Sequence, residues 1–196
     1  EAVRRSLIKI MKTVVKSSQQ LFINKKADAA IIKEWSMAEG AIVEVQNFME
    51  KLSSITQHMS RNDYNNHVAI IHAIDHMKRF LKTVKENEKL AYVHLDDNVK
   101  EVAERVTDIL IITENELDYE NMDELVMQVE ENAKIIADIR RADRKRFLKT
   151  PAKNMLNIDD AIQMVHVIHW LDTISYHLWR IIYYLSIIDS NVEDEE

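Results

Sequence analysis

Residues 159–188 read DDAIQMVHVIHWLDTISYHLWRIIYYLSII, a stretch that contains no glycine and no proline. Apolar side chains recur along it at intervals of three and four residues, at Ile162, Val165, Ile168, Leu171, Ile174, Leu178, Ile181 and Leu185. This spacing places them along one face of an α-helix. At a rise of about 1.5 Å per residue the helix would be about 45 Å long. The stretch therefore predicts a fold built from long, packed helices.

The composition of the whole chain leads to the same fold class. Its 196 residues include one glycine and one proline, with 46% apolar and 30% charged residues. Sheet proteins use glycine and proline at their many turns, so this composition excludes a sandwich, a barrel or a doubly wound sheet. It also excludes a glycine-rich phosphate loop. Because the chain has no cysteine, disulfides and thiolate sites are excluded as well. We expect an all-α protein.

Similar apolar stripes predict five further helices, which cover about residues 3–21, 28–52, 68–87, 96–111 and 122–147. Asp28 is the predicted N-cap of the second, and Pro151 is expected to end the fifth. The polar segment Ser60–Asn66 is expected to form a turn. Gly40 lies within the second helix, where a residue without a side chain indicates a close contact with another helix.

The third and sixth predicted helices are related by a repeat. An offset of 97 residues places His72 on His169 and Asp75 on Asp172, with apolar positions matching around them. The repeat predicts a tandem of two antiparallel three-helix bundles, that is, six long helices. The expected domains are residues 1–90 and 91–190, and residues 191–196 are expected to form a disordered acidic tail.

Histidine and carboxylate side chains three residues apart share a helix face, and such pairs can bind zinc, iron or manganese. The weak metal candidates are His72, Asp75, His169 and Asp172, with His76 and His166 beside them. The alternative is that each pair hydrogen-bonds internally or lies at the edge of the core. A ferritin-like di-iron centre is excluded, because the chain contains no Glu-x-x-His. No other cofactor and no catalytic site are expected.

Charge is unevenly distributed along the chain, whose formal net charge of −7 argues against a nucleic-acid partner. Eight acids and no basic residue lie between Glu114 and Glu131. A basic cluster follows at Arg140, Arg141, Arg144, Lys145, Arg146 and Lys149. These cations either stabilise the negative end of a helix dipole or form a docking patch for an anionic surface. The stripe of Tyr176, Trp179 and Tyr183 belongs either to the core or to a contact with a partner or a second copy.

Residues 170–181, WLDTISYHLWRI, resemble the last-helix signature of PhoU-like proteins, which has the form Leu-Glu-Arg-Ile-Gly-Asp-His. Asp172 stands in place of the glutamate, and the positions that match are Leu171, Ile174 and His177. The ending His-Leu-Trp-Arg-Ile is most similar to the PhoU-like region at the C-terminus of bacterial sodium/phosphate cotransporter proteins. Residues 74–77 form a fainter copy. PhoU-like proteins hold metal clusters through Glu/Asp-x-x-x-Asp motifs, but here Arg79 and Tyr176 occupy the second acidic position.

The resemblance implies a tandem of three-helix bundles that regulates phosphate uptake, and hence phosphate homeostasis, through protein contacts. It places the domain at the cytoplasmic face of the inner membrane. The implied partner is the membrane transporter portion of the same chain or a separate phosphate transporter, and a homo-oligomer is compatible with it. No small-molecule substrate is expected.

Two alternatives stay open. The chain could be a free-standing PhoU-like adaptor in phosphate signalling, or a metal-dependent helical protein that uses His169 and Asp172. No run in the sequence approaches the roughly 18 apolar residues of a membrane span. Because the chain begins without methionine, inside a helical pattern at Glu1, we expect it to be part of a longer protein.

Overall fold

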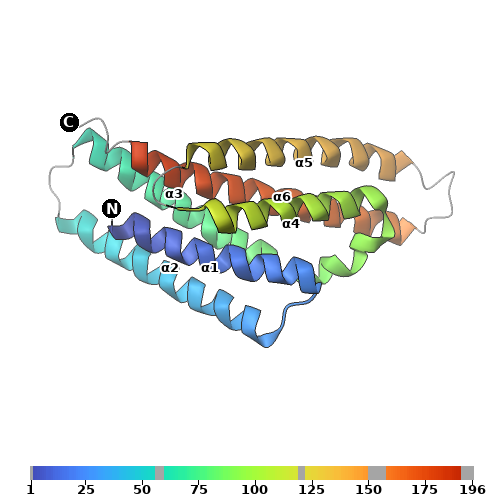
Figure 1. Ribbon diagram of the computed structural model, residues 1–196, viewed down its shortest axis with the longest axis horizontal. Coiled ribbons are helices and arrows are strands. Elements are labelled where there is room, and N and C mark those ends of the chain that lie inside the picture. The colour runs from blue at the N-terminus through green and yellow to red at the C-terminus, as the bar shows by residue number, and fades with distance from the viewer. Residues whose placement is uncertain (1, 56–59, 119–121, 150–157, 191–196) are drawn as a thin grey trace.

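The structure is a computed structural model that describes residues 2–55, 60–118, 122–149 and 158–190, with the side chains at 52–55, 147–149 and 189–190 left out. Every regular element in these ranges is a helix, which confirms the all-α prediction (Figure 1). The elements are α1 (Ala2–Asn24), α2 (Ala29–Ile55), α3 (Arg61–Val84), the 3₁₀ helix η1 (Asn87–Leu95), α4 (Asp97–Glu116), α5 (Asp123–Lys149) and α6 (Ile158–Ser190).

Capping side chains set two of the predicted helix starts. The Oδ1 atom of Asp28 accepts a hydrogen bond from the backbone N–H of Ile31 at 2.9 Å, which confirms the predicted N-cap of α2. Asp96 caps α4 in the same way and accepts from the N–H groups of Asn98 and Val99. Pro151 and residues 191–196 lie outside the described residues, so the helix stop and the acidic tail remain predictions.

The predicted turn over Ser60–Asn66 is wrong, because α3 begins at Arg61. Ser60 is its N-cap, and the Ser60 Oγ accepts from the backbone N–H of Asp63 at 3.0 Å. The first turns of α3 are polar, so a search for apolar periodicity starts the helix too late. Sequence analysis also missed η1, whose nine residues are too few to show a clear period.

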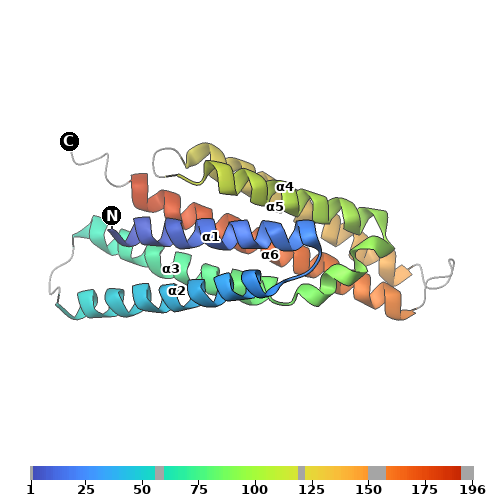
Figure 2. The ribbon, with the colours of Figure 1, turned by 60° about the horizontal axis from the view of Figure 1, so that its bottom comes forward.

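All of the α-helices run along the long axis of the molecule, as Figures 1 and 2 show from two directions. The helix α6 contacts α1, α3, α4, α5 and η1, which explains why apolar residues occupy several of its faces. The buried apolar side chains of all these elements form one continuous cluster. The predicted boundary between residues 90 and 91 falls inside η1, and the division into two domains stays a prediction.

The most extensive helix pair is α3 with α6, and two contacts fix its register. His76 faces His177, and the indole N–H of Trp170 donates to the Thr83 carbonyl at 2.7 Å. Seven residues forward along α3 correspond to seven residues backward along α6, so the two helices are antiparallel. This register places position 78 opposite position 175, and these positions differ by 97, which is the offset of the sequence repeat.

Gly40 does not mark a close helix contact, contrary to the prediction. It is exposed on α2, and a Cβ added there would have no neighbouring atom within 4 Å. The helix α2 packs on α1 and makes a smaller contact with α3, and neither helix approaches this position.

Candidate functional site

The candidate site lies where α3 and α6 cross, at His76 and His177. Their Nδ1 atoms are 2.9 Å apart, which is a hydrogen-bond distance. Such a bond requires one Nδ1 to carry a proton and the other to accept it, so two fully protonated rings are incompatible with it. His177 is buried and His76 is half-buried. One hydrogen bond between the two imidazoles therefore links the two halves of the chain.

The surroundings of both rings favour their neutral forms. Burial, followed by His76 and Arg79, lowers the pKa of His177 from 6.5 to about 4, although Asp75 acts in the opposite direction. Burial, followed by Arg180, lowers the pKa of His76 as well. The pair consequently carries no charge at pH 7, and acidification adds charge to a partly buried contact.

Aromatic rings surround the histidine pair. His72 and His76 both stack on Tyr184, with ring centroids 4.7 and 5.8 Å away. Tyr176 packs edge-on against His76, His177 and Trp179. We call this group of His72, His76, Tyr176, His177, Trp179, Tyr183 and Tyr184 the aromatic seam. Tyr176 and Tyr183 are 44% and 37% exposed, so the predicted aromatic stripe is only partly core and also reaches the surface.

Arg180 lies in the middle of the aromatic seam. Its guanidinium carbon is 5.2, 5.3 and 4.7 Å from the ring centroids of Trp179, Tyr183 and Tyr184. It donates a hydrogen bond from Nη2 to the Tyr184 hydroxyl, and its buried Nε has no hydrogen-bond partner in the described part of the chain. Arg180 falls within the signature-like residues 170–181, but the sequence indicated no role for it, because the lack of a carboxylate partner among the described residues is visible only in three dimensions.

The predicted metal candidates do not come together. His72 lies in the aromatic seam while His169 is exposed, and by the α3–α6 register they are separated by about twelve residues, or roughly 18 Å, along the helix axis. Asp75 forms an ion pair with Arg79 at 2.8 Å, and Asp172 forms one with Arg140 at 3.0 Å. No group of three or more potential ligand side chains converges anywhere in the described part of the chain.

Asp172 and His169, two of the predicted metal ligands, lie in different surroundings. Burial raises the pKa of Asp172, and the neighbouring Arg140, His169 and Arg141 act in the opposite direction. The exposed His166 and His169 border a hollow of about 310 Å³ that Glu86 and Lys89 also line. Asp172 pairs with Arg140 of α5, whereas His169 borders this hollow. The two side chains therefore have different neighbours.

The predicted basic patch is largely committed to ion pairs. Arg140 pairs with Asp172, and Arg141 pairs with Asp138. Arg146 contacts the carboxylates of Asp96 and Asp143. Arg144 and Lys145 are exposed, and Lys149 lies outside the described side chains. The described cations that remain for an anionic surface are fewer than the sequence count indicates.

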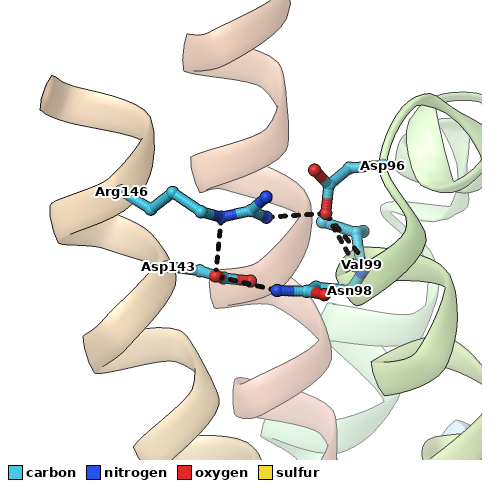
Figure 3. A network of polar contacts seen from close by, with 5 residues as sticks. All are labelled: Asp96, Asn98, Val99, Asp143 and Arg146. Carbon is cyan, nitrogen blue, oxygen red and sulfur yellow. Dashed lines mark hydrogen bonds and ion pairs between the residues drawn. The ribbon is translucent and has the colours of Figure 1, made fainter. Parts of the chain in front are cut away.

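Figure 3 shows the network around Arg146, which ties the end of α5 to the start of α4. Arg146 reaches Asp96 at 2.7 Å and Asp143 at 2.9 Å. Asn98 donates a further hydrogen bond to Asp143 at 3.2 Å. Asp96 also caps α4, so a single carboxylate joins the helix cap to the ion pair. Arg146 therefore has a structural role at the contact between α4 and α5.

Comparisons with known proteins add no relative. No protein-family model, no curated protein and no solved structure matches this chain. Among the described helices, none combines the length and the apolar composition that crossing a membrane requires.

Proposed function

We propose that this chain is a PhoU-like regulatory domain of a sodium-dependent phosphate cotransporter, which acts at the cytoplasmic face of the membrane by contacting the transporter. The signature-like segment at residues 170–181 motivates the family, and the duplicated pattern motivates the architecture. In this proposal the domain binds and biases its partner between states and catalyses no reaction.

The register of α3 against α6 is the observation that supports the proposal best. In a two-fold related duplication, equivalent positions of the two copies meet at the axis. Positions 78 and 175 are equivalent by the sequence offset, and the contacts of His76 and Trp170 place them opposite each other. An accidental pairing of two amphipathic helices has no reason to choose that offset.

The chemistry of the aromatic seam is compatible with a binding role. It offers exposed tyrosine rings, imidazole and phenol hydrogen-bonding groups and one guanidinium, which are groups that anchor protein contacts. These groups come from both α3 and α6, which form the most extensive helix contact, so a partner bound to them would act on both halves of the chain.

The test is removal of residues 1–196 from the chromosomal gene, followed by measurement of radiolabelled phosphate uptake in cells grown at low and high phosphate. We expect the deletion to abolish the dependence of uptake on phosphate supply, and reintroduction of the intact segment to restore it. Uptake that stays normally regulated in the deletion strain would overturn the proposal.

Immunoblotting of the native protein separates the cotransporter domain from the free-standing adaptor. An antibody against this chain should detect a protein much larger than 23.0 kDa in the membrane fraction. A soluble protein of about that mass that co-purifies with a transporter would favour the adaptor instead.

A further inference from the structure

The aromatic seam contains a positive charge that no carboxylate among the described residues balances. Arg180 is half-buried, and it forms no ion pair within the described residues. The neighbouring Arg79 is neutralised by Asp75, so Arg180 gives this part of the surface a net positive charge. An arginine that is partly withdrawn from water without an acidic partner loses hydration, and here ring contacts and one hydrogen bond to Tyr184 replace part of it.

The rings hold the Arg180 guanidinium in place without using its donors. Three ring centroids lie between 4.7 and 5.3 Å from its central carbon, which is the range of cation–π contacts. A guanidinium has five N–H donors, and here one of them binds the Tyr184 hydroxyl. The Nε donor is buried and finds no partner among the residues that the structure describes. The group is therefore oriented in advance, with most of its hydrogen-bonding capacity unused.

Further donors lie next to Arg180. The Tyr184 hydroxyl accepts from Arg180, which leaves its own proton available to a ligand. His72 and His76 stack on the same tyrosine ring, and His72 is exposed to solvent. Cationic and neutral donors from α3 and α6 thus lie within one small area. A metal ion would be repelled by the guanidinium, whereas an anion would be attracted to it.

We propose that Arg180, together with Tyr184, His72 and His76, binds a small tetrahedral oxyanion such as sulfate or inorganic phosphate. Planar guanidinium donors match the oxygens of such anions and form charge-assisted hydrogen bonds with them. The proposed site depends only on the charge of Arg180 and on unused donors, and it is independent of the proposed role in phosphate uptake. The site adds a small-molecule ligand that sequence analysis did not expect.

The test is a titration of the isotopically labelled 196-residue chain with sodium sulfate, followed by NMR of the histidine and tryptophan side chains at constant ionic strength. We expect saturable shifts at His72, His76 and Trp179, with a dissociation constant in the millimolar range. Arg180→Gln should weaken binding at least tenfold. Arg105→Gln is the matched control, because Arg105 is on α4 and pairs with Glu101, and it should leave binding unchanged.

A second variant controls for the case in which Arg180→Gln loses binding because it misfolds. Tyr184→Phe keeps the ring that supports His72 and Arg180 and removes only the hydroxyl, so it should fold and bind sulfate several-fold more weakly. Shifts that grow without saturation, or that persist unchanged in both variants, would overturn the proposal. Binding of sulfate and phosphate with similar constants, or a preference for phosphate, would both support it.

An experiment with lipid vesicles distinguishes a free oxyanion from a lipid headgroup as the ligand. Sedimentation with phosphatidylglycerol vesicles is measured for the parent chain and for Arg180→Gln. We expect no Arg180-dependent sedimentation, since the ligand is a free ion. If vesicles bind through Arg180 while free sulfate does not, the site recognises a lipid headgroup and the proposal of a free oxyanion is overturned.

Discussion

The Nδ1 atoms of His76 and His177 meet at 2.9 Å although the two residues are 101 positions apart in the chain. One hydrogen bond between neutral imidazoles thus spans the contact between α3 and α6. Because that bond depends on at least one unprotonated ring, the packing of the two halves is coupled to pH.

We predict that acidification destabilises the fold between about pH 6.5 and 4. The pKa of His177 falls from 6.5 in the unfolded chain to about 4 in the fold, so within this window only the unfolded chain takes up the proton. Its free energy of unfolding should therefore decrease as the pH falls, and stay constant above that window as far as this group is concerned. We expect a contribution of about 1–2 kcal/mol, because the ring keeps some contact with water. Urea unfolding at several pH values measures it.

The control for this effect separates His177 from the carboxylates, which also titrate in acid. His177→Asn places an amide group near the position of Nδ1 and should flatten the pH dependence. His166→Asn alters an exposed histidine and should retain the slope of the parent chain. Equal slopes in all three proteins would show that the histidine pair does not control stability.

Trp170 is predicted to be a major contributor to the stability of the α3–α6 contact. It is 2% exposed, stacks on Phe22 with centroids 5.6 Å apart, and donates a hydrogen bond to the Thr83 carbonyl. Trp170→Ala should lower the free energy of unfolding by about 3–5 kcal/mol. Trp170→Phe keeps an aromatic ring and should cost about 1–2 kcal/mol, chiefly through the lost hydrogen bond. Chemical denaturation measures both.

An exposed aromatic residue on α3 is the comparison for these variants. Tyr64 is 60% exposed, and Tyr64→Ala should change stability by less than about 0.5 kcal/mol. A Trp170→Ala protein as stable as the Tyr64→Ala protein would contradict the assigned core.

The sequence was sufficient to predict the α-helices but not the short η1, because a long apolar stripe specifies an α-helix whatever it packs against. The start of α2 at Asp28 followed from capping chemistry, which is local. The start of α3 was missed, since Arg61–Asn66 carries no apolar stripe and only the Ser60 cap marks it. Local pattern is therefore enough for helix identity and less dependable for helix ends.

The contacts that define the site could not be predicted in the same way. The sequence indicated that His76 and Asp75 share a helix with His72, but not that His76 would choose His177 as its partner. The basic residues of the cluster were identified correctly, but Arg146 forms an ion pair with Asp96, fifty residues earlier in the chain. Partners on other helices depend on the register between helices, and periodicity within one helix carries no information about that register.

Gly40→Ala is predicted to stabilise the protein. Gly40 is exposed on α2, a new Cβ would meet no atom within 4 Å, and its φ is not positive. Alanine loses less backbone entropy on folding and should raise the free energy of unfolding by about 0.5–1 kcal/mol. The gain corresponds to about 2–4 °C per kcal/mol in the melting temperature. The reverse change at the exposed Ala142, Ala142→Gly, should lower the melting temperature by a similar amount. A lower melting temperature for Gly40→Ala would contradict the open environment at this position.

The last prediction concerns the join between α4 and α5. Asp143 is 4% exposed, and Arg146 supplies its only positive partner among the described residues. Arg146→Gln should therefore cost about 1–3 kcal/mol, because a buried carboxylate would keep only the hydrogen bond from Asn98. Arg144→Glu, on the same turn but exposed, should change folding stability by less than about 0.5 kcal/mol. Adding Asp143→Asn to Arg146→Gln removes the stranded charge and should recover part of the loss, so the double-mutant cycle should give a coupling energy of about 1 kcal/mol or more. Additive effects in that cycle would mean that the ion pair in Figure 3 contributes nothing to the join, and the basic end of α5 would again be available as a docking patch.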